Sequence, residues 1–248
     1  MEVRNIHIVQ AVIPKYRVPF FNEILKNSDN NYFFYCSKYF EGYPNTAIKD
    51  IKFDISFFKI KTVFNILFWF SDFELYKNIK KGDIVVLEGN LRYLNNFKFL
   101  FLSKFLNYKI VWWSIYDMPY SNIINKYIRE IFMHIVDYNI VYTEREYKNF
   151  ITKYKNFKNI AYLNNTIDIS RFKQFNEMSD ELIKYKNSIL KNKNVLIYCG
   201  RLTKKPRLEL VLNFLKKYDI QNKFHFIIIG DGEEKENLVN LSIEYKIE

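Results

Sequence analysis

The stretch from Val195 to Glu248 constrains the fold of this chain more than any other part of the sequence. It reads in order as an apolar strand (VLIYCG), a cationic turn, an amphipathic helix, a second apolar strand (FHFIIIG), an Asp-Gly turn and a further helix. A glycine at the end of such a strand lets the backbone approach a ligand, and the N-terminus of the next helix together with nearby cations favours a phosphate. The stretch therefore predicts two strand-to-helix turns of a nucleotide-binding α/β domain.

Strands and helices also alternate through the preceding residues. We expect strands at residues 5–13, 32–36, 52–58, 84–88, 110–115, 139–142 and 160–163. The clearest helix covers residues 122–136, where isoleucines and a tyrosine recur at spacings of three and four. This order predicts parallel strands joined by covering helices.

Three parts follow from this pattern. We expect a Rossmann-like domain over residues 1–170, an inter-domain linker over residues 171–192 and a second Rossmann-like domain over residues 193–248. A complete domain of the second kind has roughly 100 to 150 residues. We therefore expect this sequence to stop inside its second domain.

Composition and charge limit the classes of partner. Cys36 and Cys199 lie in apolar runs, which favours buried free thiols of a reducing cytoplasm over a disulfide or a zinc site. The N-terminus lacks the pattern of a signal peptide, and no stretch approaches the roughly 18 apolar residues of a membrane span. We therefore predict a cytoplasmic protein with no metal. The net charge of +11 favours a nucleic acid, an anionic membrane face or a phosphorylated substrate.

Two segments have the composition of membrane-contacting elements. Phe64–Phe73 is strongly apolar, and Leu94–Lys109 mixes Phe and Leu with lysines, as a basic amphipathic helix does. The alternative is that both are ordinary helices covering a parallel sheet, since such helices also need an apolar face. Peripheral contact with the inner face of the cytoplasmic membrane and simple covering of the sheet both stay open.

The two turns of the C-terminal stretch support a named resemblance. The first is Gly200-Arg201-Leu202-Thr203-Lys204-Lys205-Pro206, and the second is Gly230-Asp231-Gly232 at the end of an apolar strand. Together they resemble the nucleotide-binding half of the retaining glycosyltransferases of family 4, which have the GT-B fold. The resemblance implies a nucleotide-diphosphate sugar as donor substrate, with no further cofactor.

Softer matches to the same family lie earlier in the chain. Residues 163–172 (LNNTIDISRF) resemble the inter-domain signature of the family, with Asn164 in place of the usual proline. Residues 13–21 (IPKYRVPFF) resemble the first strand-to-helix turn of a subgroup that acts on bacterial polysaccharide precursors. The family's later pair of glutamates has no counterpart here, because Glu233, Glu234 and Glu236 come too early.

Transfer of a sugar from a nucleotide diphosphate leaves negative charge on the departing phosphate, so fixed cations stabilise the transition state. Arg201 suits this role because its guanidinium can bind two phosphate oxygens. The family's lysine position holds Pro206, so Lys205, or else Lys204, would replace it, and Pro206 fits the first turn of the next helix. The alternatives are a solvated cationic turn and, at residues 230–232, a tight turn without a ligand.

Candidates on the acceptor side come from the N-terminal half. Lys15, Tyr16 and Arg17 lie in the first strand-to-helix loop, and Tyr116 and Asp117 follow a later strand. The loop cations suit an anionic acceptor such as a pyrophosphate-linked lipid, or are simply solvated. His7, His134 and His225 sit in apolar runs and are interpreted as packed residues. No catalytic residue can be assigned.

We therefore predict a glycosyltransferase, or its truncated product, that moves a sugar from a nucleotide-diphosphate sugar to a lipid-linked or saccharide acceptor in bacterial envelope polysaccharide biosynthesis. The retaining, metal-independent course is implied by the resemblance alone. The alternative is a non-catalytic Rossmann-like binding or assembly protein that has lost the donor site. A nucleic-acid partner is not expected, because the +11 charge is unaccompanied by a zinc spacing, an RNA-binding motif or a dense basic run.

Overall fold

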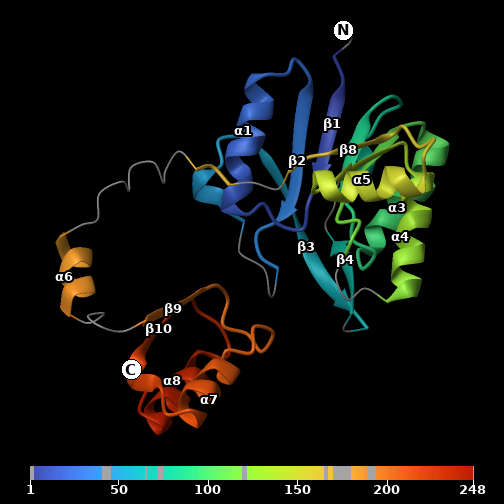
Figure 1. Cartoon of the computed structure of the whole chain (residues 1–248). Helices are drawn as coiled ribbons and strands as arrows, with labels where there is room; N and C mark the ends of the chain where they lie inside the picture. Colours follow the sequence, from blue (N-terminus) through green and yellow to red (C-terminus); the bar gives the residue numbers. More distant parts are fainter. Residues whose placement is uncertain are drawn as a thin grey trace. The chain divides into compact units, whose positions relative to one another are not determined.

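The computed structural model describes residues 3–40, 46–64, 66–71, 75–118, 122–164, 167–169, 180–188 and 194–247. The chain forms two compact units, Met1–Ile169 (unit 1) and Ser170–Glu248 (unit 2) (Figure 1). Most of the predicted linker lies outside the described residues, apart from the helix α6 (Asp180–Ser188).

A large, almost entirely parallel sheet forms the centre of unit 1. Among the described residues it has eight strands in the order β4-β3-β2-β1-β5-β6-β7-β8, and only β3 and β4 pair in antiparallel fashion. The strands are β1 (Asn5–Val9), β2 (Asn31–Ser37), β3 (Ile55–Val63), β4 (Leu67–Ser71), β5 (Ile84–Glu88), β6 (Lys109–Ser114), β7 (Tyr138–Val141) and β8 (Ile160–Tyr162). The predicted α/β class with a parallel sheet is confirmed.

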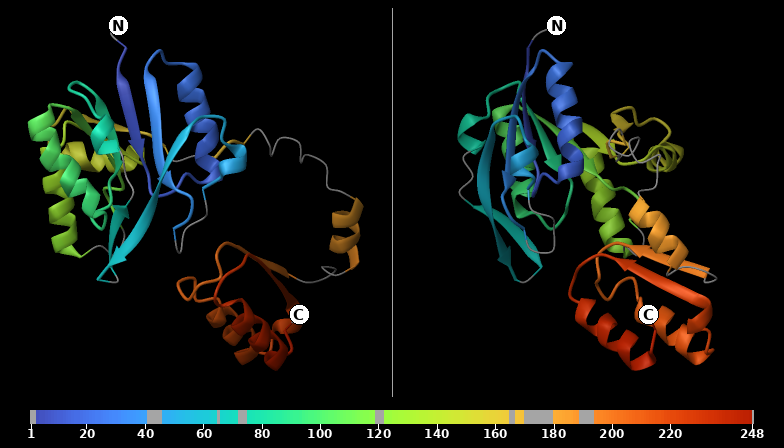
Figure 2. Two further views of the ribbon diagram at one scale, coloured as in Figure 1. Left: turned by 180° about the vertical axis from the view of Figure 1, so that it is seen from behind. Right: turned by 90° about the vertical axis from the view of Figure 1, so that its left-hand side faces the viewer.

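Helices cover both faces of this sheet (Figures 1 and 2). They are α1 (Val18–Lys26), α2 (Leu75–Asn78), α3 (Leu94–Leu106), α4 (Ile123–Ile135) and α5 (Glu144–Lys153). Phe21 of α1 packs with Trp113 in one core cluster, whereas α3, α4 and α5 pack on Trp112 in the other. Trp112 and Trp113 are neighbours in β6, so their side chains point to opposite faces of the sheet.

Within residues 64–73, Leu67–Ser71 form strand β4, so the alternative that this segment is a covering helix is wrong. β4 pairs with β3 in a hairpin, and β3 starts at Ile55 rather than at residue 52. Phe68 and Phe70 point into the core and alternate with half-buried neighbours, which is the period of a strand with one covered face.

Helix α4 forms where the isoleucine spacing predicts it, and the Asn122 side chain caps it by accepting from the Asn125 N–H. Its orientation is unusual. The stripe with Ile124 and Tyr127 is exposed, and the side that faces the sheet includes Arg129 and Glu130.

Unit 2 contains the strand-helix-strand-helix order that the sequence predicts. Strands β9 (Asn194–Cys199) and β10 (Phe224–Ile229) pair in parallel, and helices α7 (Glu209–Lys217) and α8 (Lys235–Tyr245) pack on them. Leu208, Leu212 and Leu215 are buried, as the spacing predicts. Across the part of the chain that the structure describes, we find no helix long and apolar enough to cross a membrane.

Candidate functional site

In unit 2, the loops that follow β9 and β10 are held together by backbone hydrogen bonds. The Gly200 N–H donates to the Ile229 carbonyl (3.0 Å), and the Leu202 N–H donates to the Asp231 carbonyl (2.9 Å). The Glu234 N–H, which follows the second turn, donates to the Leu202 carbonyl (3.0 Å). The two glycine turns singled out in the sequence therefore form one structure at the carboxyl end of the two strands, where ligands of α/β sheets bind.

Glycine is required at this junction for reasons of space. A Cβ on Gly230 would overlap the carbonyl oxygen of Gly200, and a Cβ on Gly232 would overlap that of Leu202. Gly232 also has a φ of +152°. Tight packing of the two loops alone explains these glycines, so they do not by themselves indicate a ligand.

The cations of the first loop lie on the surface of unit 2. Arg201, Lys204 and Lys205 are exposed, and the Arg201 carbonyl accepts a hydrogen bond from the Tyr198 hydroxyl (3.0 Å). Asp231, in the second loop, forms an exposed ion pair with Lys235 (3.5 Å). The loops thus present several positive charges at one strand edge, with the Asp231 carboxylate beside Lys235.

Pro206 does not begin the helix, contrary to the sequence prediction. Helix α7 starts at Glu209, after Arg207 has adopted a left-handed φ of +57°. A residue in that conformation interrupts a right-handed helix, so Pro206 belongs to a turn. Lys204 and Lys205 consequently lie in a longer loop than the sequence suggests.

A cavity of about 290 Å³ lies beneath these loops, between β10, α7 and α8. It is lined by Leu202, Leu212, Phe226, Ile228, Gly230, Lys235, Leu238, Val239, Ser242 and Ile247. This lining is mainly apolar, and a diphosphate requires N–H donors and cations. The cavity is a gap in helix-sheet packing, and the exposed loops are the better place for a phosphate.

In unit 1, polar side chains gather around Arg17 at the carboxyl ends of the strands. Arg17 is only 8% exposed; its Nη1 donates to the Gln10 Oε1 and its Nη2 to the Tyr142 hydroxyl, both over 2.7 Å. Its guanidinium carbon also lies 4.7 Å from the centre of the Trp113 ring. Arg17 is therefore not a solvated loop cation, and that alternative is wrong.

Glu88, the last residue of β5, supplies the nearby negative charge. Its Oε2 accepts the Ala11 N–H over 2.8 Å. Burial raises the pKa of Glu88, while the Ala11 N–H and the charge of Arg17 act in the opposite direction. Burial likewise raises the pKa of the Tyr142 hydroxyl, and Arg17 opposes that effect.

Two donors of this cluster are unused. The Nε of Arg17 is buried and has no hydrogen-bond partner among the described residues, and the same holds for the Nε1 of Trp113. A buried donor without a partner costs roughly 1–3 kcal/mol. A ligand oxygen reaching the Arg17 Nε–H would remove that cost, so the cluster is suited to an acceptor that carries oxygen atoms or negative charge.

The other acceptor-side candidates lie in different surroundings. Lys15 is exposed and forms an ion pair with Asp50 (3.4 Å), and Tyr16 is also exposed. Their places in the loop before α1 leave them accessible, and the Lys15 ammonium pairs with Asp50 outside the Arg17 cluster.

Tyr116 is a core residue between α4 and α5. Its hydroxyl donates to Glu130 (2.9 Å), its ring packs on Phe150, and burial raises the pKa of that hydroxyl. Asp117 accepts from Asn149 and lies 4.0 Å from Lys126. The structure therefore places Tyr116 with the α4–α5 side of the sheet, not with the α1 side that holds Arg17.

Gln10, Glu88 and Tyr142 are not among the site residues that the sequence predicts. Each is the last residue of an apolar strand or the one directly after it. The carboxyl ends of parallel strands meet at one edge of the sheet, where ligands bind. The position of these polar residues at strand ends is therefore the sequence signal that could have identified them. Of the inter-domain signature, Asn164 and Asp168 are described, whereas Asn165, Thr166 and Phe172 lie outside the described residues.

No group of three or more His, Cys, Asp or Glu side chains within the described ranges is arranged to hold a metal ion. The buried histidine of unit 1 has a structural environment instead. His7 Nε2 lies 3.1 Å from Asp83 and its Nδ1 lies 3.3 Å from the Tyr35 hydroxyl.

Comparison with known proteins shows what parts of this chain are similar to. Residues 179–248 match the family model described as glycosyl transferases group 1. An uncharacterized glycosyltransferase of Methanocaldococcus jannaschii is 27% identical over 97% of this chain and 58% of its own length. The chain thus spans less than two thirds of that relative.

Solved structures share the fold. A glycosyltransferase from Rickettsia africae matches 100% of this chain and 66% of its own chain, with a TM-score of 0.58 and 16% identity. A putative UDP-N-acetylglucosamine 2-epimerase from Listeria monocytogenes matches 99% of this chain and 67% of its own chain, with a TM-score of 0.58 and 13% identity. The predicted GT-B type of α/β fold is confirmed, and the fold alone does not separate a transferase from an epimerase.

Proposed function

We propose that this chain, whose residues 179–248 match glycosyl transferases group 1, takes part in transferring a sugar from a nucleotide-diphosphate sugar to an acceptor. The observation that carries the proposal is the joined pair of loops in unit 2. They combine two glycine turns with exposed Arg201, Lys204 and Lys205 at the carboxyl end of parallel strands.

The chemistry assigned to these loops is stabilisation of the leaving group. As the bond between the sugar and the diphosphate breaks, negative charge grows on the departing phosphate oxygens. Arg201 would bind two of these oxygens, and Lys205 or Lys204 would supply a second charge. We include in the proposal a retaining course without a metal ion, which follows from the family resemblance.

For the acceptor side we propose the Arg17 cluster of unit 1. A pyrophosphate-linked lipid or a saccharide offers oxygen atoms to the unused Nε–H of Arg17, and the exposed Lys15 and Tyr16 lie in the same connection. Envelope polysaccharide biosynthesis in a bacterium is the setting that we propose for such an acceptor.

The division of roles between the units gives a test by calorimetric titration of UDP and GDP. Arg201→Ala should weaken nucleotide binding roughly tenfold or more, since a charge-assisted pair contributes about 1.5–3 kcal/mol. Arg17→Lys, which keeps the charge in unit 1, and Lys216→Ala, which removes an exposed cation from α7, should leave nucleotide binding unchanged. Equal losses in Arg201→Ala and Lys216→Ala would show that only the overall charge matters.

The alternative function is that of a non-catalytic binding or assembly protein with the same fold. Titration with a nucleotide-diphosphate sugar, followed by analysis of released nucleotide in the presence of acceptor, separates the two. Saturable binding with no release of nucleotide would favour the alternative.

A further inference from the structure

Helices α3 and α4 of unit 1 present apolar side chains to solvent. The two helices touch, because the Phe97 and Phe132 rings meet edge to face with centroids 5.1 Å apart, and they lie side by side on one face of the sheet (Figures 1 and 2). We call their outward surface the α3–α4 face. It is defined by Phe97, Phe101, Phe105, Ile124, Tyr127 and Ile131, all of which are exposed.

On α3, two asparagines share the buried side with Phe99, while other phenylalanines lie outside. Phe101 and Phe105 are 65% and 68% exposed, whereas Asn95 and Asn96 on the opposite side are buried. The asparagines are held inside by hydrogen bonds to backbone groups: Asn95 bonds both the N–H and the carbonyl of Phe70, and Asn96 bonds the Glu88 carbonyl. The orientation of the helix is therefore fixed with Phe101 and Phe105 outward.

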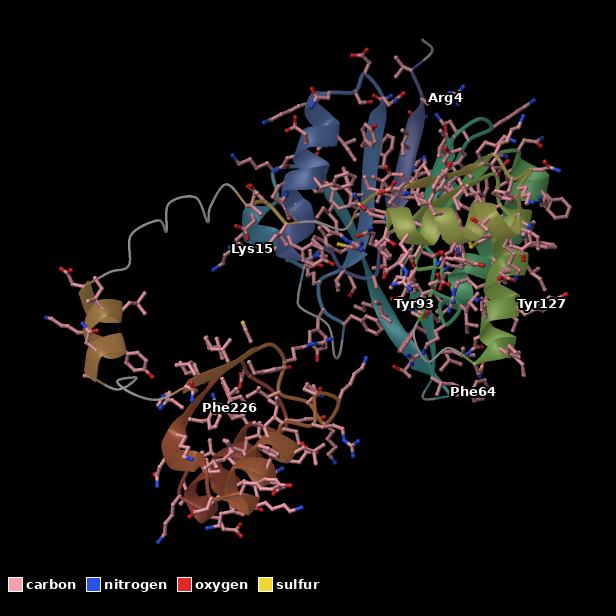
Figure 3. All side chains as sticks on the ribbon, in the orientation of Figure 1. Arg4, Lys15, Phe64, Tyr93, Tyr127 and Phe226 are labelled. Atoms are coloured by element: carbon pink, nitrogen blue, oxygen red, sulfur yellow. The ribbon has the colours of Figure 1, made fainter. Side chains whose placement is uncertain are left out.

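Helix α4 also turns polar side chains inward, beside the buried Phe132 and Met133. Arg129 and Glu130 face inward: Arg129 donates to the Tyr116 carbonyl (2.9 Å), and Glu130 accepts from Lys153 (2.7 Å). Tyr127, on the outward stripe, is 66% exposed and points away from the sheet (Figure 3). A surface with this much contiguous aromatic and aliphatic area on two neighbouring helices is typical of an interaction site.

The charges on this face identify the kind of partner. Lys98 and Lys104 of α3 are exposed. The only carboxylate in either helix is Glu130, which is buried and neutralised by Lys153. Of the acidic residues that flank the helices, Asp117 lies 4.0 Å from Lys126 and Asp137 is paired with Lys109 at 2.8 Å. The face therefore combines apolar side chains with the charges of Lys98 and Lys104, for which we find no carboxylate partner among the described residues.

We propose that the α3–α4 face docks on the surface of an anionic phospholipid bilayer. The Phe, Ile and Tyr side chains enter the boundary between headgroups and acyl chains, and the lysines extend to the lipid phosphates. The occupant is a bilayer and not an acidic protein, because the apolar residues form stripes along both helices with cations beside them, which is the pattern of helices that lie in a membrane interface. This inference does not depend on the donor site of unit 2.

The test is co-sedimentation of the full chain, without nucleotide, with vesicles of phosphatidylcholine alone and with vesicles that contain phosphatidylglycerol as well. We expect binding only to the anionic vesicles. Phe101→Ser with Phe105→Ser, and separately Lys98→Glu with Lys104→Glu, should each weaken it roughly tenfold or more. Lys216→Glu with Lys217→Glu on α7 changes the net charge equally and should retain binding.

Conservative double variants and circular dichroism distinguish a specific loss of vesicle binding from a loss of folding. Phe101→Leu with Phe105→Leu, and Lys98→Arg with Lys104→Arg, should bind as the wild type does, and all variants should keep the circular-dichroism spectrum because the altered side chains are exposed. The proposal is overturned if the wild type binds no vesicle, or if the α7 control loses binding as much as the α3 variant. It is also overturned if the double variant Phe101→Ser with Phe105→Ser converts a dimer of the chain to monomers and leaves vesicle binding intact.

Discussion

Arg17 and Tyr142 are joined by a hydrogen bond of 2.7 Å from the Nη2 to the hydroxyl oxygen. The bond ties the connection before α1 to the residue after β7, two places that are 125 residues apart in the chain. The same guanidinium bonds Gln10 and lies over the Trp113 ring, so it holds the carboxyl ends of three strands together.

Replacement of Arg17 should therefore destabilise unit 1. Arg17→Met leaves the Gln10 and Tyr142 oxygens without their donor, and we expect a loss of roughly 2–4 kcal/mol in the free energy of unfolding. Lys15→Met removes only an exposed ion pair and should change it by less than about 0.5 kcal/mol. Urea unfolding followed by tryptophan fluorescence measures both, since Trp69, Trp112 and Trp113 all lie in unit 1. Equal midpoints for the two variants would contradict this role.

Gly230→Ala should destabilise unit 2. The new Cβ would overlap the Gly200 carbonyl oxygen, so the two loops must separate. We expect a cost of roughly 2–4 kcal/mol, seen by circular dichroism and not by the tryptophans of unit 1. Gly82→Ala is the control: Gly82 has a φ of +87° but no atom within 4 Å of the new Cβ, so it should cost only about 1 kcal/mol. A Gly230→Ala protein as stable as Gly82→Ala would show that the loops are loosely packed.

Stability should depend on the protonation of His7. Burial lowers the pKa of His7 below its ordinary 6.5, and it outweighs the opposing hydrogen bond and charge of Asp83. Below pH 6.5 the unfolded chain therefore binds more protons than the folded one, and stability falls as the pH drops from 6.5 through the folded pKa. The free energy of unfolding should rise with pH across this range more steeply in the wild type than in His7→Gln. If the free energy of unfolding rises with pH equally steeply in both proteins, His7 is not the group responsible.

The two cysteines should differ in reactivity. Cys36 is fully buried, and burial raises its pKa to about 11, whereas Cys199 is exposed. Because the thiolate is the reacting species, a disulfide reagent should modify one thiol of the native chain and two after denaturation. Cys199→Ser should abolish the native reaction. Reaction of two thiols in the folded protein would place Cys36 within reach of solvent.

The fold was predictable wherever local pattern and tertiary packing agree. The apolar runs of β1 and β5 are buried or half-buried parallel strands, and their sequences show it directly. The apolar run of β9 is also a parallel strand, but Val195 and Ile197 on one of its faces are exposed. The hairpin of β3 and β4 was missed because its turn lacks the Asn-Gly or Asp-Gly pair of a two-residue hairpin loop, and Phe64 adopts a φ of +51° without being glycine or asparagine. A short apolar run such as residues 66–70 fits a helix and a strand equally well.

The site was predictable only in part, for a related reason. The turns of Gly200 and Gly230 could be found because close backbone approach demands glycine, a requirement visible in sequence. The partners of Arg17 come from distant strand ends, and their distances depend on how the sheet assembles. The exposed stripe of α4 shows the same limit, since spacing identifies an apolar face but not what that face packs against.

Diphosphate binding by the loops after β9 and β10 can be measured by calorimetric titration of the chain with UDP and, in parallel, with uridine, at low and moderate salt. We expect saturable binding of UDP that weakens with salt, little binding of uridine, and loss of this difference in Arg201→Ala. Equal affinities for UDP and uridine, or UDP binding unaffected by Arg201→Ala, would contradict it.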